Sequence, residues 1–277
     1  MIGRGKSKKT TRVIAVANQK GGVGKTTTTI NLAASLALGD RTVLVVDLDP
    51  QANLTSGIGR KGDFAVAGTI YDAMTVDPAP DIADYIVSTG VSGLSLLPAD
   101  RNLTGAEVEL ISLDRRETRL RPLLRQVRDR FDYIFIDTPP SLGFLTVNAL
   151  VAAEAMLIPL TCEYFALEGL AELTTTLRRV QGSFNPELEI AGVLLTMVDP
   201  RTNLGRQVAQ DVRNFFGDKV FETVIPRNVR LGEAPSHGLP AILYDVKSKG
   251  AEAYLSLARE FMGLGRGPVP EGAMNHG

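Results

Sequence analysis

The residues best suited to chemistry form one glycine-rich run, Lys20-Gly21-Gly22-Val23-Gly24-Lys25-Thr26-Thr27. The run follows a short apolar segment at 13–17 and opens an amphipathic segment that extends to about residue 38. Glycines let consecutive backbone N–H groups point at phosphate oxygens, and the positive end of the following helix adds to the attraction. In such a loop Lys25 contacts the β- and γ-phosphates and the Thr26 hydroxyl binds Mg²⁺. The run therefore predicts a phosphate-binding loop for a nucleotide and its magnesium ion.

The loop departs from two established phosphate-binding patterns. The pattern G-x-x-x-x-G-K-[ST] requires glycine at position 19, where this chain has Gln19, and we take Gly21 and the additional Lys20 as compensation. A dinucleotide-binding G-x-G-x-x-G loop is excluded, because counting from Gly22 places Thr27 where the third glycine belongs. Lys20 has no task in an ordinary loop of this kind.

Three acidic residues follow predicted strands. Asp137 ends an apolar run at 133–137, the usual position of an aspartate that holds Mg²⁺ directly or through water. Asp47 and Asp49 end a second run at 43–47, beside the phosphate loop. Each has a structural alternative: a helix cap for Asp137 and a side-chain turn before the following proline for Asp49.

The sequence gives a weaker indication of the base. The guanine-specific pattern [NT]-K-x-D is not met by Thr196-Met197-Val198-Asp199, because Met197 replaces the lysine. Adenine is therefore favoured over guanine.

Alternating short and long segments must position these residues. Short β-rich apolar runs predict strands at 13–17, 43–47, 94–97, 133–137, 156–160, 190–196 and 220–225. Amphipathic segments predict helices at about 25–38, 105–130, 143–153, 165–181, 204–216 and 250–262. Near-continuous apolarity is typical of strands that are covered on both faces. We therefore expect a single-domain α/β fold with a doubly wound, mostly parallel sheet, helices on both faces, and ligands at the carboxyl ends of the strands.

The composition excludes several classes of protein. The chain has 277 residues, is 44% hydrophobic and 22% charged, and carries a formal net charge of -1, so most of it is not disordered. Its single cysteine, Cys162, excludes an internal disulfide, a zinc site of several thiolates and an iron–sulfur cluster held by this chain alone. Two histidines make a His-rich metal centre improbable.

The ends of the chain differ from its centre. Residues 1–11 form a basic segment that contains Arg4, Lys6, Lys8 and Lys9, and we expect a flexible tail that either contacts an anionic partner or is silent. Residues 12–263 form the predicted domain, and the Gly/Pro-rich residues 264–277 are expected to be disordered. No segment has the roughly 18 consecutive apolar residues of a membrane span, so we expect a cytoplasmic protein.

Four motifs together resemble the ParA/MinD family of P-loop ATPases with a deviant Walker A loop. They are the loop at 20–27, the segment at 46–53 (Val-Asp-Leu-Asp-Pro-Gln-Ala-Asn), the segment at 136–140 (Ile-Asp-Thr-Pro-Pro), and the segment at 225–238. The last segment is similar to the chromosome-partitioning ParA (Soj) branch, apart from Gly232, where that branch has serine. The resemblance covers most of residues 12–261.

The resemblance implies a role for each residue of the site. ATP is held by residues 20–27 (Lys20, Gly21, Gly22, Val23, Gly24, Lys25, Thr26 and Thr27), and the base rests near Met197, Pro226 and Asn228, although ordinary core and turn roles are equally open there. Mg²⁺ is held by Thr26, Asp47 and Asp137, with Asp47 more an organiser of the metal shell and its loop. Lys20, Lys25 and Asp49 are the catalytic set.

Two of these roles have a clear physical content. Asp49 positions or activates the attacking water. Lys20 crosses to the nucleotide of a second subunit, where it supplies positive charge in trans, as an arginine finger does. ATP binding and homodimer formation then become one equilibrium.

The resemblance also implies partners for this ATPase. Arginines that match Arg201 and Arg230 bind non-specific double-stranded DNA in the dimer, and Arg227, Lys247 and Lys249 are candidates to extend that surface. Solvated surface charges are the alternative for each. A ParB-like protein stimulates slow hydrolysis, so we expect association with the nucleoid and chromosome or plasmid partition. Two alternatives stay open: a ParA-like positioner of another cargo, and a MinD-like membrane-surface ATPase, although no stable membrane association is expected because 251–264 lacks a basic face.

Overall fold

The computed structural model describes residues 11–62, 64–110, 113–163, 166–199 and 201–263. Within them, a seven-stranded sheet has the strand order β3-β4-β2-β5-β1-β6-β7. The strands are β1 (Arg12–Val16), β2 (Val43–Asp47), β3 (Val87–Ser88), β4 (Leu94–Leu97), β5 (Tyr133–Asp137), β6 (Ala155–Thr161) and β7 (Glu189–Thr196). Only β3 at one edge is antiparallel to its neighbour. The predicted mostly parallel sheet is confirmed.

The register of the central strands sets up the site. Every residue of β2 is buried, as is every residue of β5 after Tyr133, which fits strands covered on both faces. Asp137 at the end of β5 pairs with Val16 on one side and with Asp47 on the other. Two predicted acidic residues, Asp47 and Asp137, therefore lie side by side at the carboxyl ends of adjacent strands.

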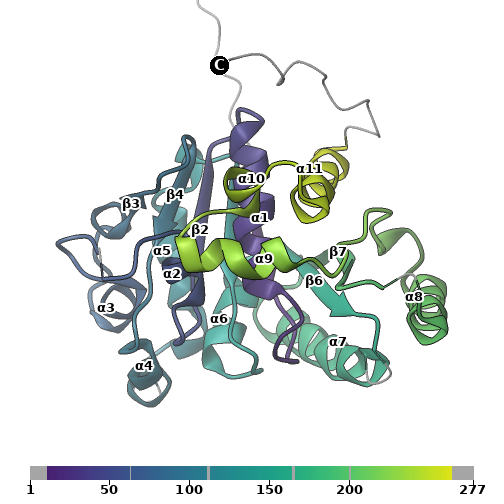
Figure 1. Cartoon of the computed structure of the whole chain (residues 1–277). Coiled ribbons are helices and arrows are strands. Elements are labelled where there is room, and N and C mark those ends of the chain that lie inside the picture. The colour runs from purple at the N-terminus through teal and green to yellow at the C-terminus, as the bar shows by residue number, and fades with distance from the viewer. Residues whose placement is uncertain (1–10, 63, 111–112, 164–165, 200, 264–277) are drawn as a thin grey trace, which may run out of the picture.

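Helices cover both faces of the sheet, as Figure 1 shows. One core lies under α1 (Lys25–Leu38), α2 (Asn53–Gly57), α9 (Val229–Glu233), α10 (Ala241–Tyr244) and α11 (Lys249–Phe261). The opposite core lies under α3 (Ile70–Thr75), α4 (Leu103–Glu109), α5 (Leu120–Arg125), α6 (Phe144–Ala152), α7 (Ala166–Ser183) and α8 (Asn203–Phe216). This is the expected doubly wound arrangement.

The predicted helix at 105–130 is wrong. In the described part of this range the structure has α4, α5 and the 3-10 turns Arg116–Thr118 and Arg128–Arg130 in its place. Arg115 adopts a left-handed conformation with φ 55°, which interrupts a helix. Pro122 lies in the first turn of α5, where its missing N–H is tolerated, whereas it would break the interior of a longer helix.

The predicted strand at 220–225 is also wrong. Phe221 and Ile225 donate backbone hydrogen bonds to β7, at 3.0 and 2.9 Å, but the residues between them do not continue the ladder. The carboxylate of Glu260 in α11 accepts from the N–H groups of Glu222 and Thr223 instead, at 2.6 and 2.9 Å. A side chain thus satisfies backbone donors that a strand would have used.

The other predicted elements agree with the structure to within two residues at each end. Thr11, assigned from sequence to the basic tail, is buried in the folded body, and its hydroxyl donates to the carbonyl of Phe131 at 2.8 Å. The rest of that tail and the predicted disordered tail at 264–277 lie outside the described residues. None of the helices in the described ranges is long and apolar enough to cross a membrane.

Candidate functional site

The glycine-rich loop joins the carboxyl end of β1 to the start of α1. Gly22 and Gly24 have φ values of 72° and 88°, which residues with side chains rarely adopt. The Thr196 hydroxyl at the end of β7 donates to the carbonyl of Val23 at 2.8 Å and so ties the loop to another strand. The loop conformation is therefore fixed by two left-handed glycines and one cross-strand contact.

Lys25 is held inside the loop. Its side chain belongs to a residue only 7% exposed, and its Nζ lies 3.3 Å from the carbonyl oxygen of Lys20. Burial lowers the pKa of Lys25, while the nearby carboxylates of Asp137 and Asp49 oppose that shift. A buried cation that receives only partial compensation from its own chain can be stabilised by an anionic ligand.

Asp137 and Thr26 lie against each other at the start of α1. The Thr26 hydroxyl donates to Oδ2 of Asp137 at 2.6 Å, and Thr29 lies 3.4 Å from Oδ1. Burial and the neighbouring charge of Asp47 raise the pKa of Asp137 well above its usual range. A hydroxyl and a buried carboxylate beside a phosphate loop suit Mg²⁺, which takes oxygen ligands and keeps several waters or phosphate oxygens. The residues present fit that ion.

Asp47 is bound to the loop that follows its own strand. Its carboxylate accepts from the N–H and hydroxyl of Thr55, at 2.8 and 2.7 Å, and from the N–H of Asp49 at 3.2 Å. Complete burial raises the pKa of Asp47 to about 6, although these hydrogen bonds oppose the shift. The contacts account for a loop-organising role, and a direct metal contact stays a prediction. Thr55 is a residue that the sequence reasoning missed.

Asp49 makes the turn that was its structural alternative. Its Oδ1 accepts from the N–H of Gln51 at 2.9 Å. Asp49 is buried, and its charge acts on both Lys25 and Asp137. The turn holds one carboxylate oxygen, so the residue keeps acceptor capacity for a water. Its catalytic role stays a prediction.

Lys20 has a partner other than the phosphate site. Its ammonium forms an ion pair with Glu163, directly after β6. The hydrogen bond from Lys20 lowers the pKa of Glu163. Lys20 thus pairs with Glu163, whereas the carboxylates that act on Lys25 are those of Asp137 and Asp49, although both lysines belong to one loop.

A pocket of about 210 Å³ lies beside the loop. It is lined by Gly24 and Thr27 and by the three residues predicted to contact the base, Met197, Pro226 and Asn228. Its lining also includes Leu231, Gly232 and Tyr254, which the sequence reasoning did not assign to the base. Met197 adopts φ 51°, an uncommon conformation for a residue with a side chain.

The predicted DNA-binding residues form two linked pairs, with Arg201, Arg227 and Lys247 outside the helices and strands and Arg230 in α9. Arg201 and Arg227 follow two segments that pair at Val198 and Pro226, and both lie near Asp199. Arg230 and Lys247 share Asp245, through an ion pair of 3.3 Å and a backbone hydrogen bond of 3.2 Å. All four are exposed.

Two of these arginines are paired within the chain. Arg201, with a side chain 86% exposed, contacts both carboxylate oxygens of Asp199, at 2.9 and 2.7 Å, and this lowers the pKa of Asp199 to about 2. Arg230 pairs with Glu233 at 2.7 Å in addition to Asp245. Sequence spacing alone did not identify these carboxylates as their partners.

Together, the left-handed glycine loop, the buried lysine and the Thr26–Asp137 contact define a P-loop nucleotide-binding protein. The family model for an AAA domain matches residues 11–190. The chain is 55% identical over 251 residues to chromosome partitioning protein ParA of Myxococcus xanthus, with 91% of this chain and 88% of that protein covered. It is 56% identical over 250 residues to sporulation initiation inhibitor protein Soj of Bacillus subtilis, covering 90% of this chain and 97% of that protein.

A solved structure agrees with these sequence matches. The cobyrinic acid a,c-diamide synthase of Mycobacterium smegmatis, described with bound ADP and magnesium, superposes with a TM-score of 0.78 at 38% identity. The match covers 91% of this chain and 94% of that one. The chain belongs to the ParA/Soj family of P-loop ATPases, as its motifs predicted.

Proposed function

We propose that this ATPase is a switch that dimerises with ATP, binds non-specific DNA as the dimer and partitions chromosome or plasmid DNA. The observation that carries the nucleotide part is the Thr26–Asp137 contact of 2.6 Å at the mouth of a loop with left-handed Gly22 and Gly24. The names of the 55–56% identical relatives support partition as the process.

The residues of the loop divide the work of binding the phosphates. Backbone N–H groups around Gly22 and Gly24 donate to phosphate oxygens, and Lys25 neutralises the β/γ end. Thr26 and Asp137 hold Mg²⁺, which supplies charge neutralisation at the transferring phosphoryl group. Asp47 holds the loop containing Asp49 in place through its bonds to Thr55 and Asp49.

The base would occupy the pocket between the loop and the late strands. Met197 and Pro226 supply apolar walls, and Asn228 supplies an amide. The Asn228 side-chain oxygen already caps the N–H of Arg230 at 3.0 Å, so its N–H₂ group is available as a donor. An amide donor suits a ring nitrogen acceptor, which adenine offers.

Asp49 and Lys20 act at the γ-phosphate from different chains. Asp49 orients the attacking water in its own chain. Lys20 leaves Glu163, reaches the phosphates bound by the second subunit and supplies positive charge there. Breaking the ion pair between Lys20 and Glu163 costs little free energy, because an exposed ion pair contributes only about 0–1 kcal/mol.

The dimer would present two copies of Arg201, Arg227, Arg230 and Lys247 to one duplex. Two linked patches bind far more tightly than one, so ATP-driven dimerisation controls DNA binding. Phosphate contacts carry no base information, which suits a protein that covers the nucleoid in the cytoplasm. A ParB-type partner would stimulate hydrolysis and release.

The MinD-like alternative requires an apolar helix face for the membrane. In the structure, Tyr254, Leu257 and Phe261 of α11 are buried in the core shared with α1. That face is already used within the domain. A ParA-like positioner of another cargo would use the same nucleotide chemistry. It would differ from a DNA-partitioning protein in the partner protein that it binds.

The experiment measures light scattering, DNA retention and liposome sedimentation of the full chain with ADP and with ATP. We expect an ATP-dependent dimer that binds duplex DNA and ignores anionic liposomes. Lys20→Ala should bind ATP as a monomer and lose DNA retention, whereas Asp49→Ala should bind ATP and accumulate the dimer without turnover. ATP-independent DNA binding, or ATP-dependent liposome binding, would contradict the proposal.

A further inference from the structure

A crevice lies at the end of the sheet where the central parallel strands begin, opposite the end that carries the phosphate loop. It has a volume of about 300 Å³ and is bounded by α5, the end of α6 and the segment before β7. Val13 near the start of β1 and Glu154 just before β6 belong to its lining, so it lies at the amino ends of parallel strands. The phosphate loop follows the carboxyl end of β1. The crevice is therefore separate from the nucleotide site.

Three arginines share one side of this crevice. Arg121, Arg125 and Arg128 follow the i, i+4, i+7 spacing of one helical face, although the last lies in the 3-10 turn after α5. Arg121 donates to the carbonyls of Val151 and Phe184, at 2.7 and 3.3 Å. These neutral acceptors anchor the guanidinium but do not neutralise its charge.

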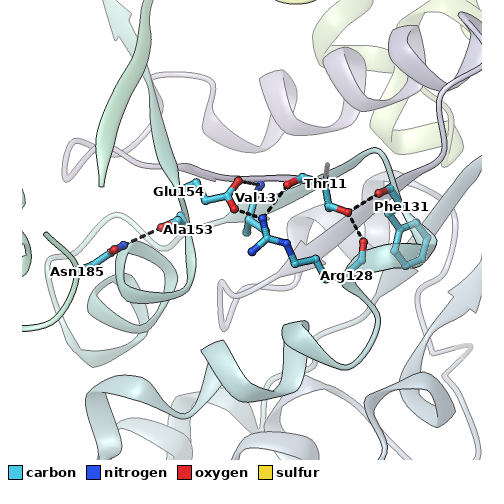
Figure 2. A network of polar contacts seen from close by, with 7 residues as sticks. All are labelled: Thr11, Val13, Arg128, Phe131, Ala153, Glu154 and Asn185. Carbon is cyan, nitrogen blue, oxygen red and sulfur yellow. Dashed lines mark hydrogen bonds and ion pairs between the residues drawn. The ribbon is translucent and has the colours of Figure 1, made fainter. Parts of the chain in front are cut away.

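Among the residues that the structure describes, Arg128 is the one arginine of the three with a directly bonded carboxylate, that of Glu154. Figure 2 shows its guanidinium between Glu154 and the carbonyl of Thr11, to which it donates at 3.0 Å. Glu154 also accepts from the N–H of Val13 at 3.3 Å. Its carboxylate is therefore largely used by its own chain.

Arg125 is the available cation. It is exposed, and in the described part of the chain it has neither a hydrogen bond nor an ion pair. Burial and the charge of Arg125 lower the pKa of Arg121, which Glu187 at the rim only partly offsets. With Glu154 and Glu187 as the acids of the lining, three arginines leave a net positive crevice.

The crevice also has apolar walls. Leu124 and Ala153 are buried beneath it, and Phe184 is 39% exposed at its side. Arginine and aromatic side chains are enriched at protein interfaces, where they supply most of the binding energy. The exposed ring of Phe184, on the same crevice as the guanidinium of Arg125, suits an apolar side chain next to a carboxylate better than a polar phosphodiester backbone.

Thr11 connects the start of the described chain to the crevice. Its hydroxyl donates to the carbonyl of Phe131 at 2.8 Å, and its carbonyl accepts from Arg128 at 3.0 Å, as Figure 2 shows. Arg128 is therefore held by Thr11 as well as by Glu154.

We propose that this crevice is a docking site for an acidic segment of a partner protein, with a partner carboxylate on Arg125 and an apolar neighbour against the exposed ring of Phe184. The site goes beyond the proposed switch function, because it lies away from the nucleotide and the DNA-binding arginines. Because the crevice is separate from the nucleotide site, a partner can bind it both in the ADP state and in the ATP state.

The test uses fluorescence anisotropy of a short labelled peptide in which glutamate and leucine alternate, with a glutamine-for-glutamate peptide as the control ligand. The full chain should bind the acidic peptide saturably, and equally with ADP and with ATP. Arg125→Glu should weaken binding roughly 10-fold or more, and Arg125→Gln should weaken it less. Arg130→Glu is the matched control, because Arg130 is an exposed arginine nearby that does not line the crevice.

Each other outcome overturns the proposal. Absence of saturable binding, or equal losses in Arg125→Glu and Arg130→Glu, means that the crevice is a solvated gap with general positive charge. A loss of DNA retention in Arg125→Glu, with peptide binding unchanged, makes the surface a nucleic-acid contact. Thermal melting of each variant identifies unfolding, which we do not expect because Arg125 has no bonded partner among the described residues.

Discussion

The phosphate site and the predicted DNA-binding arginines carry charge in different ways. Lys25, Asp47 and Asp137 are buried and hold one another or their own loops. Arg201 and Arg230 are exposed and pair with carboxylates of their own surface. Buried charge is costly unless it is compensated, whereas exposed ion pairs contribute little.

The difference suits the two tasks. A rigid buried site is organised before the nucleotide arrives, so little free energy is lost in ordering it. Exposed arginines can exchange Asp199 or Glu233 for a DNA phosphate at small cost. We therefore expect substitutions at the phosphate site to abolish function. Substitutions of the exposed arginines should instead reduce the affinity for DNA without abolishing nucleotide binding.

The largest effect, a complete loss of turnover, is expected for Lys25→Ala. The change removes the buried loop cation and with it a charge-assisted contact worth about 1.5–3 kcal/mol, so nucleotide affinity should fall roughly 10-fold or more and turnover should stop. Binding of a fluorescent ATP analogue and phosphate release measure the two effects. Lys61→Ala, which alters an exposed lysine on a distant turn, is the control and should behave as wild type.

Arg230→Glu tests the exposed side of the comparison. It should reduce DNA retention about 100-fold or more while ATP-dependent dimerisation is unchanged, because an attractive phosphate contact becomes a repulsive one in both patches of the dimer. Each lost phosphate contact should also flatten the dependence of log affinity on log salt by about 0.9. Filter retention over a salt series measures both, with Arg130→Glu as a charge-matched control. An unchanged salt slope would remove Arg230 from the DNA-binding surface.

Asp47→Asn tests the cost of buried charge in the nucleotide- and metal-free protein. The pKa of Asp47 rises from 3.8 unfolded to about 6 folded, so the folded state binds more protons between these values. Stability should therefore fall as pH rises through this window, by up to about 3 kcal/mol for this group. Urea unfolding from pH 4 to 7 measures the free energy of unfolding of wild type and variant. The decrease with rising pH that is due to Asp47 should be absent from the variant. Parallel pH profiles would show that Asp47 does not titrate there.

The smallest effect is expected for Asp199→Asn. Releasing Arg201 from its carboxylate should raise DNA affinity by no more than about fivefold, since a fully exposed ion pair contributes little free energy. Asp218→Asn, which removes an equal charge from an exposed turn, is the control in the same retention assay. If both variants gain equally, net charge and not the local pair limits binding.

Six of the seven strands assigned from the sequence, and the place of the glycine-rich loop between β1 and α1, were confirmed by the structure, because hydrophobic periodicity and glycine spacing are local properties. The seventh run, at 220–225, has the same local apolarity, but the carboxylate of Glu260 takes its backbone donors. Likewise, the periodicity at 105–130 is helical throughout, while the left-handed Arg115 divides it. Local pattern was insufficient where a distant residue or one backbone conformation decided the outcome.

The sequence by itself determined the class of fold, the nucleotide loop and the family. Only the tertiary structure decided which charges meet: Asp47 beside Asp137 through the order of the strands, Lys20 with Glu163, and Arg230 with Glu233 and Asp245. It alone placed Arg121, Arg125 and Arg128 against the ends of α6 and α7 to form the crevice. The physical reason is range: turn chemistry and periodicity act over a few residues, whereas electrostatic pairing depends on where the sheet brings distant segments together.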